Sequence, residues 1–197
     1  MSILTPLVIV NRACAKLGID PLQDLLAETI GGQTAQLVYD SFVEQCLGIH
    51  PWSFGKELRA LSPITGMSSE FGFAHVFDLP GDRLGPPIRI CDTATDPDAI
   101  FNRYVLAGGQ VHADPDVLYA EVKILASPAS WTATFREAVT LGLAGDLALA
   151  LVDDANIRAQ LRQDAFGPPS AFPRGGVMGA AIQEEARAIP PRRAPVD

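Results

Sequence analysis

The feature that most restricts the fold is a segment from Ala138 to Val152 that is apolar on nearly every side, interrupted only by Thr140 and Asp146. A helix of this kind has to lie among other helices, because none of its faces suits water. Burying each leucine gains roughly 1.5–3 kcal/mol, which exceeds the cost of about 1 kcal/mol for each helical glycine. Small residues also allow neighbouring helices to approach closely: Gly142, Ala144, Gly145 and Ala148. The segment is too short to span a bilayer, so it predicts a helical bundle.

Two further helices are predicted before this segment. Thr5-Pro6 is a helix start, and Gly18 ends the apolar spacing that follows it. A second helix is expected from about Gln33 to Leu47 and is ended by Gly48 and Pro51. Its residues on one face are Ala35, Val38, Tyr39, Phe42 and Cys46.

Helical signals also flank the apolar segment. Ser127-Pro128 precedes a stripe of Trp131, Phe135 and Val139. Asp153 or Asp154 is expected to cap a helix that reaches about Phe166. The stretch "GPPSAFPRGG" then predicts a loop, and "VMGAAIQEEARA" predicts a last helical piece.

The middle third has a period of two. In "FGFAHVFDLP", from Phe71 to Pro80, the alternation is that of a strand. "PPIRICD" predicts a second strand, "FNRYVLAGGQVHAD" a hairpin around Gly108-Gly109, and "DVLYAEVKIL" a further strand with Leu118, Ala120, Val122 and Ile124 facing one way. We therefore expect a small, mostly antiparallel β region.

Together these elements predict an α+β chain in which an antiparallel α-helical bundle carries a β insert and an extended C-terminal arm. The bundle is expected to comprise residues 1–54 and 126–166, the insert residues 55–125, and the arm residues 167–197. Four large aromatic residues are expected to pack where the chain leaves and re-enters the bundle: Trp52, Phe54, Trp131 and Phe135.

The composition disfavours several classes of protein. A net charge of −8 and a pI of about 4.8 argue against broad binding of a phosphate backbone, which needs a basic surface. The three cysteines, Cys14, Cys46 and Cys91, form no C-x-x-C pair and are expected to be reduced thiols. The N-terminus lacks the basic region of a signal peptide, so we expect a soluble intracellular protein that binds no membrane.

No catalytic constellation is apparent. Cys46 and His50, four residues apart, suggest a nucleophile pair, but a core cysteine and a helix-end histidine are the simpler interpretation. His75 and His112 are a weak ligand pair, the acidic residues 92–98 lack calcium-loop spacing, and Glu184-Glu185 is expected on an exposed helix. The sequence predicts no enzyme, no metal site and no cofactor.

Arginines are concentrated near the C-terminus. The candidate residues are Arg174, Arg187, Arg192 and Arg193. They form either a solubilising end or an arm that becomes ordered on a partner with an acidic surface.

Several of these stretches, taken in order, resemble the phage tail tubular protein A family, the head-to-tail adaptors of short-tailed phages. The stretches are "NRACAKLG" with "DPLQDL", "HPWSF", "FGFAHVFDLPGDRL", the Gly-Gly hairpin and "WTATFREAVTLGLAGDLALAL", which together span roughly residues 5–165. No single motif is decisive; the conjunction is the specific feature. "GPPSAFPRGG" departs from the longer, continuous last helix of the family.

The resemblance implies a virion structural protein at the head–tail junction. It implies a ring, usually of twelve copies, with the portal protein above and a tail nozzle, stopper or terminator protein below. Double-stranded DNA would pass through its channel without specific binding, and the C-terminal arm would bind the portal. Two alternatives stay open on the residues alone: a bacterial binding module whose β insert holds a small ligand or peptide, and a hydrolase that uses Cys46 and His50.

Overall fold

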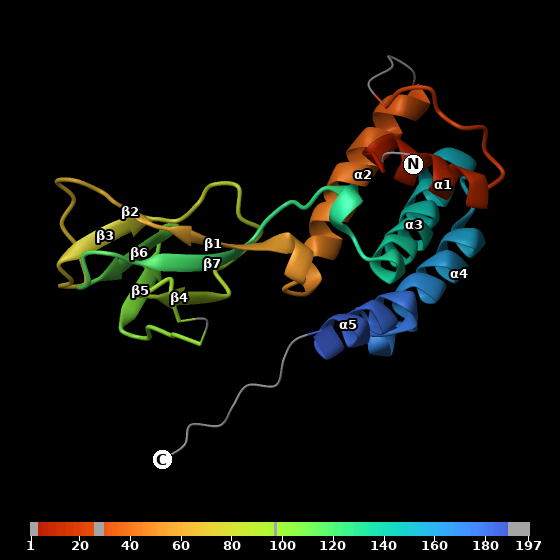
Figure 1. The fold of residues 1–197 in the computed structure, drawn as a ribbon. Coiled ribbons are helices and arrows are strands. Elements are labelled where there is room, and N and C mark those ends of the chain that lie inside the picture. The colour runs from red at the N-terminus through yellow and green to blue at the C-terminus, as the bar shows by residue number, and fades with distance from the viewer. Residues whose placement is uncertain (1–3, 26–29, 97, 189–197) are drawn as a thin grey trace. The chain divides into compact units, whose positions relative to one another are not determined.

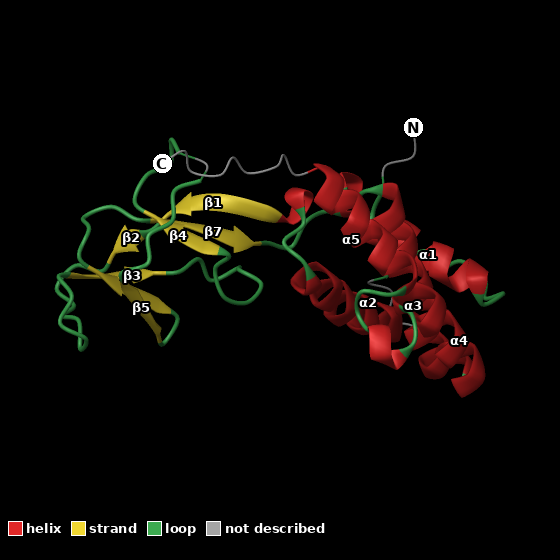
Figure 2. Cartoon of the chain, turned by 90° about the horizontal axis from the view of Figure 1, so that it is seen from below, coloured by secondary structure: helices red, strands yellow, loops and turns green. Residues whose placement is uncertain are grey.

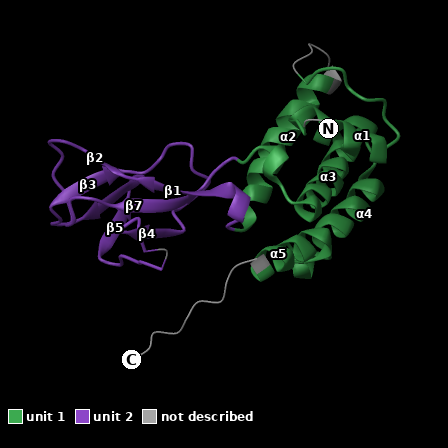
Figure 3. Ribbon diagram, viewed as in Figure 1, with its two compact units in different colours: residues 1–50, 126–197 green, residues 51–125 purple. Residues whose placement is uncertain are grey.

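A computed structural model describes residues 4–25, 30–96 and 98–188 of the chain (Figure 1). It contains five α-helices and two small antiparallel sheets within these residues. The chain divides into two compact units, one of residues 1–50 and 126–197 and the other of residues 51–125 (Figure 3). The structure is therefore a mixed α+β fold, as the sequence predicted, with helices in the first unit and strands in the second (Figure 2).

The helical unit contains all five α-helices. Their bounds are α1 Pro6–Lys16, α2 Ile30–Ile49, α3 Ala133–Leu147, α4 Ala155–Phe166 and α5 Gly176–Ala188. A single π-helical turn, Ala148–Val152, follows α3, and short 3₁₀ turns lie at Pro128–Ser130 and Pro169–Ala171. The predicted N-caps of α1 and α4 are confirmed, because Thr5 accepts from the N–H of Val8 and Asp154 accepts from those of Asn156 and Ile157.

Helix α3 is the centre of this unit and contacts α1, α2, α4 and α5. Most of its residues are buried, as expected of a helix with no polar face. Gly142 lies against the rings of Phe42 and Phe166, and a Cβ built there would approach Phe166 Cε2 to 2.8 Å. Similarly, a Cβ at Gly145 would lie 3.0 Å from Cγ of Arg162 on α4. The small residues therefore permit close helix packing, as the sequence predicted.

A compact turn connects α4 to α5. Gly167 and Gly176 have φ values of 77° and 56°, which favour glycine, and Cβ atoms at Gly167 and Gly175 would approach backbone on the other side of the turn to 2.8 and 2.7 Å. Helix α5 then packs on α3 and α4 and buries Met178 and Ala181. Residues 176–188 of the expected arm are thus a packed helix, and residues 189–197 lie outside the described residues.

Seven strands form the two sheets of the second unit. Their bounds are β1 Lys56–Ala60, β2 Ser62–Pro63, β3 His75–Asp78, β4 Arg89–Cys91, β5 Tyr104–Ala107, β6 Gln110–Ala113 and β7 Tyr119–Lys123. One sheet has the order β1-β7-β4 and the other the order β2-β3-β6-β5, with antiparallel neighbours throughout. A 3₁₀ turn at Ser53–Gly55 precedes β1.

The two sheets contribute to one hydrophobic core. Leu118, Ala120 and Val122 of the predicted β7 stripe are all fully buried, and Ile124 packs against them. Phe77 and Val111 come from the second sheet, where they are directly paired across β3 and β6. The alternation read from the sequence therefore identifies the inner face of both sheets.

The β region also differs from the sequence-based prediction. The first predicted strand was too long, because Gly72 has a φ of 79° and breaks the extended backbone before β3. Phe71 instead packs edge-on against the His112 ring, with the centroids 4.9 Å apart. Strands β1 and β2 were not predicted, because β1 is a charged edge strand without a regular apolar alternation.

Candidate functional site

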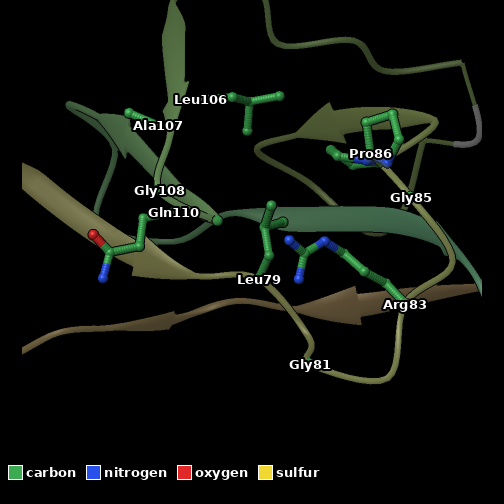
Figure 4. A pocket seen from close by; sticks show the side chains of 11 residues that line it. Leu79, Gly81, Arg83, Gly85, Pro86, Leu106, Ala107, Gly108 and Gln110 are labelled. Carbon is green, nitrogen blue, oxygen red and sulfur yellow. The ribbon is translucent and has the colours of Figure 1, made fainter.

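A hollow in the β unit lies beside the β5–β6 hairpin and has a volume of about 430 Å³ (Figure 4). Its lining includes Leu79, Arg83, Pro86 and Leu106, together with the glycines of two turns. Leu79 and Leu106 give it an apolar floor, and Arg83 gives it a cation. We call this hollow the hairpin groove.

Arg83 is positioned by the backbone around it. Its Nη1 donates to the carbonyl of Pro80 at 2.9 Å, and Arg83 forms an isolated antiparallel bridge with Ile124. Figure 4 shows the side chain extending from its loop towards Leu79, and a Cβ at Gly109 would lie 3.5 Å from Arg83 Nη2. Gly108 and Gly109 have φ values of 58° and 84°, which favour glycine in this turn. The hairpin and the arginine together form the charged end of the groove.

Cys46 lies in the interior of the helical unit and has no exposed surface. Burial raises the pKa of its thiol strongly, and the opposing effect of Arg162 is smaller. The thiol is therefore protonated at neutral pH, whereas a reactive cysteine needs an accessible thiolate. This environment favours the interpretation of Cys46 as a core residue.

His75 and His112 do not form a pair. His112 is opposite Val76 in the β3–β6 register, so the two histidines point to opposite faces of the sheet. His112 is buried, with Nδ1 3.0 Å from Ser69 Oγ, while His75 Nε2 lies 3.0 Å from Asp116 Oδ1. Each histidine therefore has a separate, structural set of contacts.

The acidic candidates fall into two different environments. In the 92–98 loop, Asp96 accepts from the N–H of Asp98, and Thr93 and Thr95 hydroxyls lie 2.9 Å apart, as in a local turn. Glu184 is exposed, but Glu185 is only 4% exposed, so the expectation that both lie on an exposed face is wrong. Helix α5 packs on α3 and α4, and Glu185 lies on its buried side. Within the described ranges, no group of three or more His, Cys, Asp and Glu residues is arranged to hold a metal ion.

The arginines of the predicted portal-binding arm are only partly placed. Arg174 is exposed in the turn before α5, and Arg187 is exposed in the last turn of that helix. Arg192 and Arg193 lie outside the described residues. The structure thus presents two of the four arginines on the surface of the helical unit.

The four junction aromatics form two local pairs. Trp52 stacks on Phe54 with ring centroids 5.7 Å apart, and Trp131 meets Phe135 edge-on at 5.2 Å. The Trp131 indole also donates to the carbonyl of Ala126 at 3.0 Å. The pairs belong to different units, and packing of one unit against the other through them stays a prediction.

The sequence did not point to the hairpin groove as a site. "GDRLGPP" and "AGGQ" are recognisable only as turns, and nothing in their spacing indicates that they meet. The sequence also did not indicate an ion cluster in the helical unit. There Arg162 Nη1 contacts both carboxylate oxygens of Asp146 at 2.7 and 2.8 Å, and Arg158 forms an ion pair with the same carboxylate. The uncharged strand "YVLA" beside Gly-Gly is the one available signal for the groove.

Neither the models of known protein families nor the curated protein sequences give a match to this chain. In the part of the chain that the structure describes, no helix combines the length and apolar character that crossing a membrane requires.

Proposed function

We propose that this chain is a structural head-to-tail adaptor, or connector, of a tailed bacteriophage. A ring of about twelve copies, the number implied by the family resemblance, joins the portal to the tail and extends the DNA channel. The protein catalyses no reaction in this role and uses no cofactor. It assembles in the host cytoplasm and remains at the head–tail junction of the virion.

The observation that carries the proposal is the way one unit interrupts the other. Residues 51–125 are inserted between α2 and α3, and the helical unit is closed by segments from both sides of the insertion. An adaptor needs two distinct surfaces, one for each neighbour along the particle. In this proposal the helical unit is an antiparallel bundle that meets the portal, and the β insert meets the next tail component.

The stretches that carry the family resemblance support the proposal by their positions. "HPWSF" contains the passage out of α2, and "WTATFREAV" contains the start of α3 after the chain returns. "F-x-LP-x-D", from Phe77 to Asp82, leads out of β3 into the loop that carries Arg83. The resemblance therefore falls on connections between elements as well as on the apolar helix.

The charge of the chain suits a channel that DNA passes through. With a net charge of −8, the surface offers little overall attraction to a polyanion, so double-stranded DNA is expected to slide without specific binding. A ring with a bore lined by lysine and arginine would contradict this part of the proposal.

A direct test is reconstitution with the portal protein that the proposal expects to be encoded beside this chain. We expect single-particle images of the mixture to show one ring of this protein bound coaxially to the portal ring. Mass photometry of the same sample gives the number of copies. A chain that stays monomeric and unbound at micromolar concentrations of both proteins would contradict the proposal.

The arm can be tested with charge-reversal variants. Arg174→Glu and Arg187→Glu together are expected to weaken binding to the portal at least about tenfold, because two exposed cations are replaced by anions, which an acidic surface repels. Arg103→Glu is the matched control, since Arg103 is 79% exposed and lies on the β unit. An equal loss of portal affinity in the double variant and in the Arg103→Glu control would indicate a general charge effect. It would contradict specific binding of the portal by the arm.

The second candidate function, a bacterial binding module, is supported by the hairpin groove. That function requires a lone chain that binds a small ligand or peptide tightly and forms no ring. The same mass measurement distinguishes the two functions, because only the adaptor reaches the mass of a ring with the portal.

A further inference from the structure

Strand β5 is an unusual sheet edge. The other edge strands of the β unit are protected against pairing: β1 carries Lys56, Glu57 and Arg59, β2 is two residues long and ends in Pro63, and β4 is three residues long with Arg89. Charge, proline and short length are the usual devices that prevent an edge from pairing with another chain. Strand β5, Tyr104 to Ala107, is four residues long and contains neither a charged residue nor a proline.

The register of the hairpin shows which backbone groups face outward. Ala107 pairs with Gln110 across the two-residue Gly108-Gly109 turn, so it forms the first hydrogen-bonded pair. Val105 and His112 form the next such pair. The N–H and C=O groups of Tyr104 and Leu106 consequently point away from β6, towards the open edge.

The side chains of Tyr104 and Leu106 lie on the inner face of their sheet. Leu106 is paired with Val111, which is paired in turn with the core residue Phe77. Leu106 is nevertheless 43% exposed, because the hairpin groove lies next to it. A chain that paired with β5 would therefore place alternate side chains beside Leu106 and at the groove.

Among the described residues, the charged end of the groove has no acidic partner. Arg83 forms no ion pair with any residue in the described ranges, although acidic side chains outnumber basic ones in the chain, 23 to 15. By comparison, Arg59 and Arg89, on strands of the same unit, bind carboxylates at 2.6 and 2.9 Å. A carboxylate from another molecule would complete the same kind of pair at Arg83.

We propose that the β5 edge and the hairpin groove bind an extended, acidic segment of a partner protein, which adds to the sheet as an antiparallel fifth strand. Its backbone exchanges hydrogen bonds with Tyr104 and Leu106. One apolar side chain lies beside Leu106, and one carboxylate contacts Arg83. This is strand addition, in which backbone bonds give affinity and pockets for alternate side chains give specificity.

The direction of the added strand fixes the order of its residues. In an antiparallel pair, the residue two positions before the one opposite Leu106 lies opposite Gly108, at the end of the hairpin where Arg83 approaches Gly109. The residue two positions after it lies opposite Tyr104. The partner segment therefore has the pattern acidic–x–apolar–x–apolar.

A second copy of this chain does not fit the site as well. If β5 of one copy paired with β5 of another, with Tyr104 opposite Leu106, the residue opposite Gly108 would be Asn102. That arrangement supplies no carboxylate to Arg83. The charge at the groove thus favours a different protein, and the inference holds for either function considered above.

The test uses the full chain and a synthetic probe peptide with capped ends, Thr-Glu-Thr-Val-Thr-Val-Thr. Its matched control replaces Glu by Gln. Fluorescence anisotropy of the labelled peptides is expected to show saturable binding to the wild type, with the Gln peptide about tenfold weaker because it lacks the charge. Absence of saturable binding below about 1 mM would overturn the proposal, since a weaker site falls outside useful recognition.

Two variants of the protein assign the binding to this edge. Leu106→Pro removes the outward N–H without removing a β5–β6 hydrogen bond, and is expected to weaken binding at least about tenfold; Leu106→Val keeps the N–H and is expected to stay within about threefold. Arg83→Gln is expected to lower the affinity for the Glu peptide to that for the Gln peptide. Its affinity for the Gln peptide is expected to equal that of the wild type. Wild-type affinity in Leu106→Pro, or an equal loss for both peptides in Arg83→Gln, would overturn the proposal.

Hydrogen exchange on the wild type supplies a test that needs no variant. Bound peptide is expected to slow exchange of the Tyr104 and Leu106 amides at least about tenfold, since both become hydrogen bonded. Amides already bonded within the hairpin, such as that of Val105, are expected to change much less. Unaltered exchange at Tyr104 and Leu106 with the peptide bound would overturn the proposal.

Discussion

At the scale of single residues, the helical unit depends on glycines where a side chain would not fit. A Cβ at Gly142 would meet the rings of Phe42 and Phe166, which themselves pack edge to face with centroids 6.0 Å apart. Gly142→Ala is therefore expected to lower the free energy of unfolding by about 1–2 kcal/mol, because overpacking costs more than the helix propensity that alanine gains. Urea unfolding followed by circular dichroism measures the change.

The matched control is Gly48→Ala in α2, where a Cβ would meet no atom within 4 Å. Alanine is expected to stabilise the chain there, by up to about 1 kcal/mol. Equal changes in the free energy of unfolding at both positions would show that helix propensity alone determines the effect of alanine. The close approach at Gly142 would then not contribute to stability.

Glu121 gives the β unit a dependence on pH. Desolvation acts to raise the pKa of this carboxyl, but hydrogen bonds from Lys56 and Arg89 outweigh it and lower the pKa below its ordinary value of 4.5. A folded-state pKa below the unfolded value adds stability above pH 4.5, and this stability is lost as pH falls through the lower folded value. Glu121→Gln is thus expected to cost about 1–2 kcal/mol at pH 7 and less at pH 3.

Chemical unfolding of wild type and Glu121→Gln between pH 3 and pH 7 gives the comparison. Glu57→Gln, at a more exposed partner of Arg59, is expected to change stability much less. A constant difference between wild type and Glu121→Gln across this range would contradict an ionic role for the carboxylate.

At the scale of secondary-structure elements, the sequence predicts best where local chemistry and burial agree. The starts of α1 and α4 were predictable because Thr5 and Asp154 are N-caps, and β7 was predictable because its buried face alternates strictly. The edge strand β1 was missed because edge strands bury too little to show a pattern. The burial of Glu185 was missed because it depends on how α5 packs on α3 and α4, which no local pattern encodes.

The candidate site was even less accessible to sequence reasoning. Arg83 and Leu106 are 23 positions apart, and only the pairing of β3, β5 and β6 brings their loops together. The free edge of β5 is likewise a property of sheet order. A strand can be recognised from its residues, but whether it has a neighbour on each side depends on the whole sheet.

The start of α4 gives a prediction at this scale. Asp154 accepts two backbone N–H groups at 2.9 and 3.0 Å, while the helix buries few of its own side chains. Asp154→Ala is expected to cost about 1 kcal/mol, since the first turn loses its cap. The control, Asp153→Asn, removes the same charge at the neighbouring position, and asparagine tolerates the φ of 56° there. It is expected to change the free energy of unfolding by less than about 0.5 kcal/mol. Thermal unfolding of both variants gives the comparison.

At the scale of the whole molecule, each of the two units is organised around residues of its own. The β unit has its own core, which joins residues of both sheets, and the helical unit is organised around α3. A body with its own core can fold alone if enough of its surface is buried, and 75 residues, 51–125, is within the range of small domains. The chain enters and leaves this unit once, at positions adjacent to β1 and β7, which pair with each other.

We therefore expect residues 51–125, expressed alone, to fold with the β5 edge and hairpin groove intact. The expected result is a dispersed amide spectrum, one cooperative unfolding transition, and affinity for the Glu-containing probe peptide within about threefold of that of the full chain, because Arg83, Tyr104 and Leu106 all belong to this unit. The same fragment with Leu106→Pro is the control and is expected to fold but to bind weakly. An unfolded fragment would mean that the core of the β unit needs the helices, and binding only by the full chain would move the peptide site away from β5.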